Sequence, residues 1–112
     1  MSIKKINIKQ VIPYLKKPWT PIVLGKVEDY EVKLSEFNGE YFWHKHEKHD
    51  ECMLVYDGSI SIELESKKEV KLKEGELIVI EKGTSHRSKA DNKALVLIFE
   101  RDTILSDFVR IE

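Results

Sequence analysis

Three of the four histidines lie in the run HKHEKHDE at residues 44–51. Side chains two apart on a strand project from the same face, so His44 and His46 would present two imidazoles side by side. A turn and a returning strand would then bring the carboxylate of Glu51 opposite this pair. Two nitrogens and one oxygen on a common face suit a borderline divalent metal ion. The alternative is a solvated hairpin tip, because His-x-His pairs also occur on exposed strands.

A second segment ends in the remaining histidine. Gly75 is followed after five residues by Glu81-Lys82-Gly83 and, two residues later, by His86. Together the two segments resemble the cupin family, whose first motif is Gly, His-x-His, Glu and Gly and whose second is Gly, Pro-x-Gly and His. The matching residues are Gly39, His44, His46, Glu51 and Gly58 in the first motif and Gly75, Gly83 and His86 in the second. The resemblance implies a metal site made of His44, His46, Glu51 and His86.

Two positions depart from the family's pattern. Glu81 stands where the family usually has Pro, and Ala90 where it usually has Asn four residues after the histidine. Neither position is a metal ligand in the family, so the implied site is retained. Three nitrogens and one oxygen accept Zn, Mn, Fe, Ni, Co or Cu, which leaves the identity of the single divalent ion open. Such a set fills four positions of a six-coordinate ion and leaves about two for water or substrate.

The elements that would position these residues are short strands. From Ile22 onward apolar residues recur with a period of two, and turn pairs such as Asn38-Gly39 and Asp57-Gly58 favour hairpins between the runs. The predicted strands are 22–27, 30–37, 40–46, 51–57, 59–65, 68–74, 77–81, 85–90 and 94–100. Nine short strands leave no room for βαβ crossovers, so the sheet should be antiparallel. We therefore expect an all-β fold, a small jelly-roll or conical β-barrel with a short N-terminal helical turn.

The ends of the chain carry weaker signals. Asn7 is a candidate helix cap before an apolar pattern at helical spacing, and Pro13 cuts that helix short. The segment between Pro18 and Pro21 reads as an extended linker that packs the ring of Trp19. We divide the chain into an N-terminal arm (1–21), a cupin barrel (22–101) and a C-terminal tail (102–112) without assigned structure.

Strand alternation also predicts the walls of a pocket. If His44 and His46 face into a closed barrel, Phe42 faces inward too. Glu51 would likewise bring Met53 and Val55 inward on the next strand. The expected substrate pocket is thus lined by three apolar side chains, Phe42, Met53 and Val55.

Outward aromatic side chains predict an assembly. By the same alternation Tyr41 and Trp43 face outward, and the arm adds Trp19. This is more aromatic surface than a chain of 112 residues usually leaves uncovered, so a homodimer is expected. The alternative is that the arm covers its own barrel.

Two further reactive side chains receive modest roles. His49 lies in the turn between the ligands, where an exposed histidine is favoured over a spare ligand or a proton shuttle. Cys52 follows Glu51 and so points away from the metal face, as a packed or surface thiol rather than a nucleophile.

Composition excludes several classes of partner. Lysine and arginine number 19 against 20 aspartate and glutamate, and both signs are interspersed, which argues against a nucleic-acid or anionic-membrane binder. No apolar run approaches the roughly 20 residues of a membrane-spanning helix. One cysteine and no recognisable signal sequence predict a cytoplasmic protein.

The sequence is similar to small stand-alone cupins that resemble mannose-6-phosphate isomerase, but this fold hosts many chemistries. The leading hypothesis is a mononuclear metalloprotein acting as an isomerase- or dioxygenase-like enzyme on a small polar molecule. The alternative is a metal-dependent module that binds or senses a small sugar or carboxylate without turnover. This alternative is supported by the lack of an evident general base beside the metal, unless His49 or Tyr56 moves in. A third possibility is a metal that only stiffens the barrel.

Overall fold

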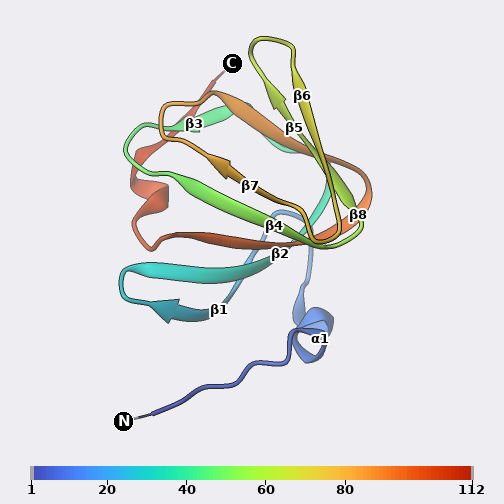
Figure 1. The fold of residues 1–112 in the computed structure, drawn as a ribbon, viewed down its shortest axis with the longest axis vertical. Coiled ribbons are helices and arrows are strands. Elements are labelled where there is room, and N and C mark those ends of the chain that lie inside the picture. Colours follow the sequence, from blue (N-terminus) through green and yellow to red (C-terminus); the bar gives the residue numbers. More distant parts are fainter. Residues whose placement is uncertain (1, 112) are drawn as a thin grey trace.

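The computed structural model describes residues 2–111, in which nine strands pair into one curled antiparallel sheet (Figure 1). The strands are β1 (Ile22–Val27), β2 (Tyr30–Glu40), β3 (His44–His46), β4 (Glu51–Asp57), β5 (Ser59–Leu64), β6 (Glu69–Lys73), β7 (Leu77–Ile80), β8 (His86–Arg101) and β9 (Phe108–Arg110). The helical turns are α1 (Ile8–Val11), η1 (Ile12–Tyr14) and η2 (Ile104–Asp107). None of the helices within 2–111 is long and apolar enough to span a bilayer. The predicted all-β fold is confirmed.

Strand β8 is the longest element and joins the two halves of the barrel. Its first residues pair with β5, and its later residues pair with β2 on one side and β4 on the other. The prediction of separate strands at 85–90 and 94–100 was wrong, because the polar residues between them stay extended. They lie on the exposed part of one continuous strand, opposite a register shift in β2 between Phe37 and Gly39.

The predicted strand 40–46 is divided in the structure. Strand β2 continues to Glu40, residues 41–43 leave the regular ladder, and β3 contains only three residues. In this irregular stretch Tyr41 donates its backbone N–H to the carbonyl of Ser88 at 3.0 Å. Strand β3 then pairs with β8 on one side and with β9 on the other. The C-terminal residues therefore complete the sheet beside the histidine pair.

Two apolar clusters stabilise this arrangement. Alternate residues of the strands fill the barrel interior, as on β5, where Ile60 and Ile62 are buried. Outside the barrel, the N-terminal arm packs over Leu34 and its neighbours on β8. Burial of each such side chain contributes roughly 1.5–3 kcal/mol. The predicted cap is confirmed, since the side chain of Asn7 accepts a hydrogen bond from the backbone N–H of Lys9.

The segment after α1 inserts an aromatic ring against the barrel. Trp19 donates its backbone N–H to Glu36 at 2.8 Å and its indole N–H to the carbonyl of Asn38 at 3.1 Å. Its ring lies 4.5 Å from that of Phe37 and 5.0 Å from that of Tyr41. The arm thus covers part of its own barrel.

Gly58 provides a test of this packing. Its φ is +86°, and an added Cβ would lie 3.1 Å from atoms of Ala94 on β8. Gly75 has a similar φ of +82° but open space around it. We expect Gly75→Ala to lose about 1–2 kcal/mol from backbone strain alone, and Gly58→Ala to lose a further 1–3 kcal/mol or so from overpacking. Urea denaturation measures both, and equal losses would contradict the close approach of β8.

Candidate metal site and its cavity

Three side chains that are distant in the sequence meet inside one end of the barrel. His44 comes from β3, Glu51 from the start of β4 and His86 from the start of β8, and all three are buried. His44 and His86 are direct cross-strand partners, which places their ring centroids 4.4 Å apart. One ligand atom from each of the three residues lies within 4.8 Å of the others. This group could hold a metal ion.

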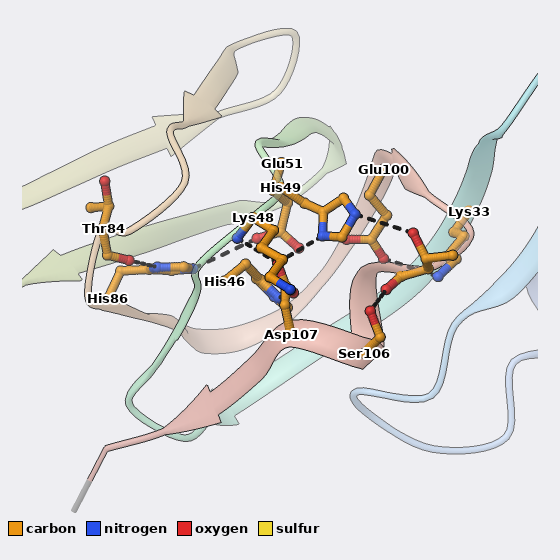
Figure 2. A network of polar contacts seen from close by, with 11 residues as sticks. Lys33, His46, Lys48, His49, Glu51, Thr84, His86, Glu100, Ser106 and Asp107 are labelled. Carbon is orange, nitrogen blue, oxygen red and sulfur yellow. Dashed lines mark hydrogen bonds and ion pairs between the residues drawn. The ribbon is translucent and has the colours of Figure 1, made fainter.

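Two atoms in this group have no hydrogen-bond partner among the described residues. They are Oε1 of Glu51 and Nε2 of His86, which are buried and lie 3.6 Å apart (Figure 2). Leaving a buried polar atom unsatisfied costs about 1–3 kcal/mol, so a native structure normally provides a partner. A cation contacting both atoms would satisfy them, and nitrogen and oxygen donors are the chemistry that a borderline divalent ion prefers.

The three candidate histidine ligands all present the same ring nitrogen. Nδ1 of His44 lies 2.9 Å from the carbonyl of Phe42, and Nδ1 of His86 lies 2.8 Å from that of Thr84. Nδ1 of His46 lies 2.9 Å from Oδ1 of Asp107. Because each Nδ1 faces an acceptor, its N–H donates and Nε2 keeps a lone pair, the form that a metal requires.

His46 adjoins the group of three without belonging to it. Its ring centroid is 5.2 Å from that of His44, and it lines the adjoining cavity. Its partner Asp107 also accepts hydrogen bonds from the backbone N–H of Lys48 and from Nδ1 of His49, both at 2.7 Å. Burial alone would raise the pKa of Asp107, but these hydrogen bonds outweigh it and lower the pKa to about 2. The carboxylate therefore stays ionised and orients His46.

The expectation that His49 is an exposed turn histidine was wrong. Its side chain is 13% exposed, and Nε2 interacts with the hydroxyl of Thr103 at 3.1 Å while Nδ1 contacts Asp107. The C-terminal residues, which the sequence analysis left unassigned, supply both partners. His49 thus belongs to the network that supports His46 (Figure 2) and lies outside the group of His44, Glu51 and His86.

A cavity of about 300 Å³ opens beside this site. It is lined by Trp19, Pro21, Lys33, Ser35, Phe37, Tyr41, His44, His46, Glu51, Met53, Ser88, Ile98, Glu100, Ile104, Leu105 and Phe108. Arm, barrel and C-terminal segment all contribute to these walls. Most of the lining side chains are aromatic or aliphatic.

The three predicted wall residues are placed differently. Met53 lines the cavity, whereas Val55 is buried in the barrel core and is not among the lining residues. The inward position expected for Phe42 is not observed, because this side chain is 48% exposed and lies under the guanidinium of Arg110. Tyr41 faces the cavity instead, since the irregular stretch 41–43 shifts the alternation of inward and outward side chains by one residue.

Two charged residues in the cavity wall were not predicted from the sequence. Nζ of Lys33 on β2 donates to Oε1 of Glu100 on β8 at 2.9 Å, and both side chains are buried (Figure 2). The strand period could have located Lys33, because it is two residues from Ser35 and four from Phe37, and all three face inward. A charged residue at an inward position of a barrel strand requires a buried partner.

Burial and hydrogen bonding shift the pKa values of these groups. Burial and a hydrogen bond shared with Glu51 raise the pKa of Glu100 to about 8, so its carboxyl keeps its proton at pH 7 and donates a hydrogen bond to the carboxylate of Glu51. Burial alone would raise the pKa of Glu51, but His86 and Glu100 stabilise its charged form and lower the pKa to about 2. Burial lowers the pKa of His44 to about 4, which keeps it neutral at pH 7. At pH 7 the carboxylate of Glu51 is therefore ionised and the imidazole of His44 is neutral, which are the forms that bind a metal.

Comparison with known proteins gives concordant results. A family model described as a cupin domain matches residues 31–99. The uncharacterized protein YdbB of Bacillus subtilis (strain 168) is 31% identical over 97 residues, which cover 87% of this chain and 86% of the relative. A cupin-2 domain containing protein from Shewanella frigidimarina has a similar structure, with 31% identity, a TM-score of 0.83, and coverage of 86% of this chain and 93% of that one.

A more distant likeness concerns the fold alone. The structure of hydroquinone 1,2-dioxygenase PnpCD, in complex with Cd²⁺ and 4-hydroxybenzonitrile, is 24% identical with a TM-score of 0.72 and covers 86% of this chain and 71% of that one. The segment matched by the family model contains all of the candidate ligands. On this match and on the identity to its relatives, the chain belongs to the cupin family.

Proposed function

We propose that this protein is a mononuclear metal-dependent enzyme that acts on a small organic molecule in the barrel cavity. The observation that supports this most directly is the pair of unsatisfied buried atoms, Oε1 of Glu51 and Nε2 of His86, of which Oε1 belongs to a residue that lines the cavity. His44 and His46 would complete the ligand set. The ion would be one of Zn, Mn, Fe, Ni, Co or Cu, since availability as well as ligand type decides occupancy.

The adjoining cavity favours an enzyme over a metal that only stiffens the barrel. His44, His46 and Glu51 all line it, so a molecule in the cavity would reach the ion directly. When bound, the metal would supply Lewis-acid polarisation of a substrate oxygen or a site for dioxygen. The chain's own residues would bind the substrate, exclude water and hold a proton at Glu100, beside the ligand Glu51. The structure of a hydroquinone dioxygenase with a metal ion and a small aromatic ligand supports a cavity of this kind.

The alternative function is a binding or sensing module without turnover. It rested on the absence of a recognisable acid or base beside the metal. The carboxyl of Glu100 and the ammonium of Lys33 lie in the cavity wall, and they could serve as the acid and base that an enzyme needs. The isomerase-like and dioxygenase-like reaction classes, the resemblance to mannose-6-phosphate isomerase and the cytoplasmic location remain parts of the proposal.

Metal binding should depend on both halves of the site. His86→Ala should weaken Zn²⁺ binding by more than the roughly 10–100-fold typical of losing a residue that only hydrogen-bonds to a ligand. His49→Ala should change it much less, because its contacts are with Asp107 and Thr103. Competition with a chromophoric chelator measures both constants on protein prepared without an affinity tag.

The same pair of variants tests turnover. A substrate screen on wild-type protein loaded in turn with each candidate metal should yield a product that disappears with chelator and in His86→Ala. Equal loss of Zn²⁺ affinity in the two variants would shift the site to the 44–51 hairpin. Ligand binding without product, across all metals, would favour the non-catalytic module.

Asp107 should act as a positioning residue for His46. Asp107→Asn replaces one of its two acceptor oxygens by a donor, so it cannot accept from His46, His49 and the backbone of Lys48 together. We expect Zn²⁺ affinity to fall about 10–100-fold. Asp102→Asn, which alters an exposed carboxylate paired with Lys26, is the matched control and should leave the affinity unchanged. An unchanged affinity in Asp107→Asn would mean that His46 is not held as a ligand.

The expected homodimer also belongs to the proposal, but through a different surface. Trp19 packs on its own barrel, whereas Leu77 and Val79 of β7 are 55% and 57% exposed beside β4. Within residues 2–111 strand β7 pairs with β4 alone, which leaves an apolar edge for a second copy. Sedimentation should give twice the 13.1 kDa of the chain, and Val79→Lys should shift it to monomer while Val70→Lys on β6 does not. A 13.1 kDa wild-type species at micromolar concentration would exclude the dimer.

A further inference from the structure

The cavity contains a second polar group, distinct from the metal ligands. Nζ of Lys33 donates to Glu100 at 2.9 Å and lies 3.5 Å from a carboxylate oxygen of Glu31. An ammonium group carries three protons, and these two carboxyl groups account for two of them. No other acceptor within residues 2–111 contacts this nitrogen, so one N–H is left for a molecule in the cavity.

The charges around Lys33 select the kind of group that it would bind. Two carboxyl groups contact this one cation, those of Glu100 and Glu31, and Glu100 also shares a hydrogen bond with Glu51. A ligand anion would lose hydration and gain carboxylate neighbours. A neutral hydroxyl group would accept a hydrogen bond from Lys33 and interact with Glu100 without that cost.

The rest of the lining favours a flat apolar body. Trp19 contacts both Phe37 and Tyr41, and these three rings form a continuous aromatic wall. The other apolar lining comes from the arm, β4, β8, η2 and β9, namely Pro21, Met53, Ile98, Ile104, Leu105 and Phe108. A volume of about 300 Å³ is at the small end of ligand sites, so one ring with small substituents is the matching size. A sugar would leave most of its hydroxyl groups against apolar walls.

From these walls and charges we infer that the cavity accepts a neutral hydroxylated aromatic ring. One ring oxygen would lie at the candidate metal site, and a second hydroxyl would bind at Lys33 and Glu100. The inference deepens the proposed function and rests on it for the metal end of the ring. Binding of the second hydroxyl depends instead on the contacts of Lys33 with Glu100 and Glu31.

Two ring compounds of similar size test the role of Lys33. The probes are 1,4-dihydroxybenzene and 4-methylphenol, titrated calorimetrically into the Zn²⁺-loaded protein under anaerobic conditions. The dihydroxy compound should bind about tenfold more tightly, which is the gain expected from one hydrogen bond to a charged group. In Lys33→Met this ratio should fall to about one, with 4-methylphenol affinity changed less than about twofold. Lys26→Met, a lysine paired with Asp102 outside the cavity, should keep the tenfold ratio.

Several results would overturn the inference. Equal binding of the two probes by the wild type would mean that Lys33 contacts no ligand. Tighter binding of 4-hydroxybenzoate than of the dihydroxy compound, lost in Lys33→Met, would make the group an anion site. Binding of glucose but of neither ring would exclude an aromatic ligand.

Two additions keep the test decisive. If Lys33→Met does not fold, Lys33→Met/Glu100→Gln removes both partners of the buried pair and should also abolish the ratio. The titrations are repeated on metal-free protein, where the ratio should persist at lower affinity. Failure to bind Zn²⁺ with an intact probe ratio would contradict the proposed function alone, whereas a lost ratio with intact Zn²⁺ binding would contradict only the inference.

Discussion

The burial of Glu51 beside three imidazoles is the constraint on which the rest of the structure depends. A carboxylate removed from water is unfavourable unless hydrogen bonds, opposite charge or a metal compensates it. In this barrel the carboxylate of Glu51 is only partly compensated. Glu100 shares a hydrogen bond with it, whereas its Oε1 faces His86 without a hydrogen bond. Strands from both halves of the chain must therefore close around this carboxylate so that His86, Glu100 and the other polar groups can compensate its charge.

Strand β8 meets this demand by pairing with strands of both halves of the barrel. Its first residue, His86, stands opposite His44, and Glu100 near its other end stands beside Glu51. Because one extended strand carries both groups, a change in its register would move them together. The C-terminal segment then closes the open edge, where β9 pairs with β3 and Asp107 holds His46 in place. Backbone pairing thus positions the strands of the site, while hydrogen bonds from the irregular residues Phe42 and Thr84 and from Asp107 orient its imidazoles.

Charge and shape divide the cavity into two functional ends. The imidazoles and Glu51 form the part that suits a metal, whereas Lys33 forms a part suited to a hydroxyl group, and aromatic rings contribute to the shared wall. The rings come largely from the N-terminal arm and the adjoining part of β2, so the arm is part of the wall as well as a cover for the outer face. Family membership does not specify this lining, since cupins share a barrel and differ in what fills it.

The sequence by itself determined the strand period, the hairpin turns and the residues of the two cupin motifs. These are local properties, since alternation and positive-φ glycines are expressed within a few residues. It did not determine the break at 41–43, which places Tyr41 rather than Phe42 in the cavity wall. This break depends on how the chain crosses from β2 to β3. Nor did it locate Lys33, Glu100 or Asp107, whose partners lie 67 residues away for Lys33 and 61 for Asp107. A buried charge is paired through space, so only the closed barrel decides which distant residue compensates it.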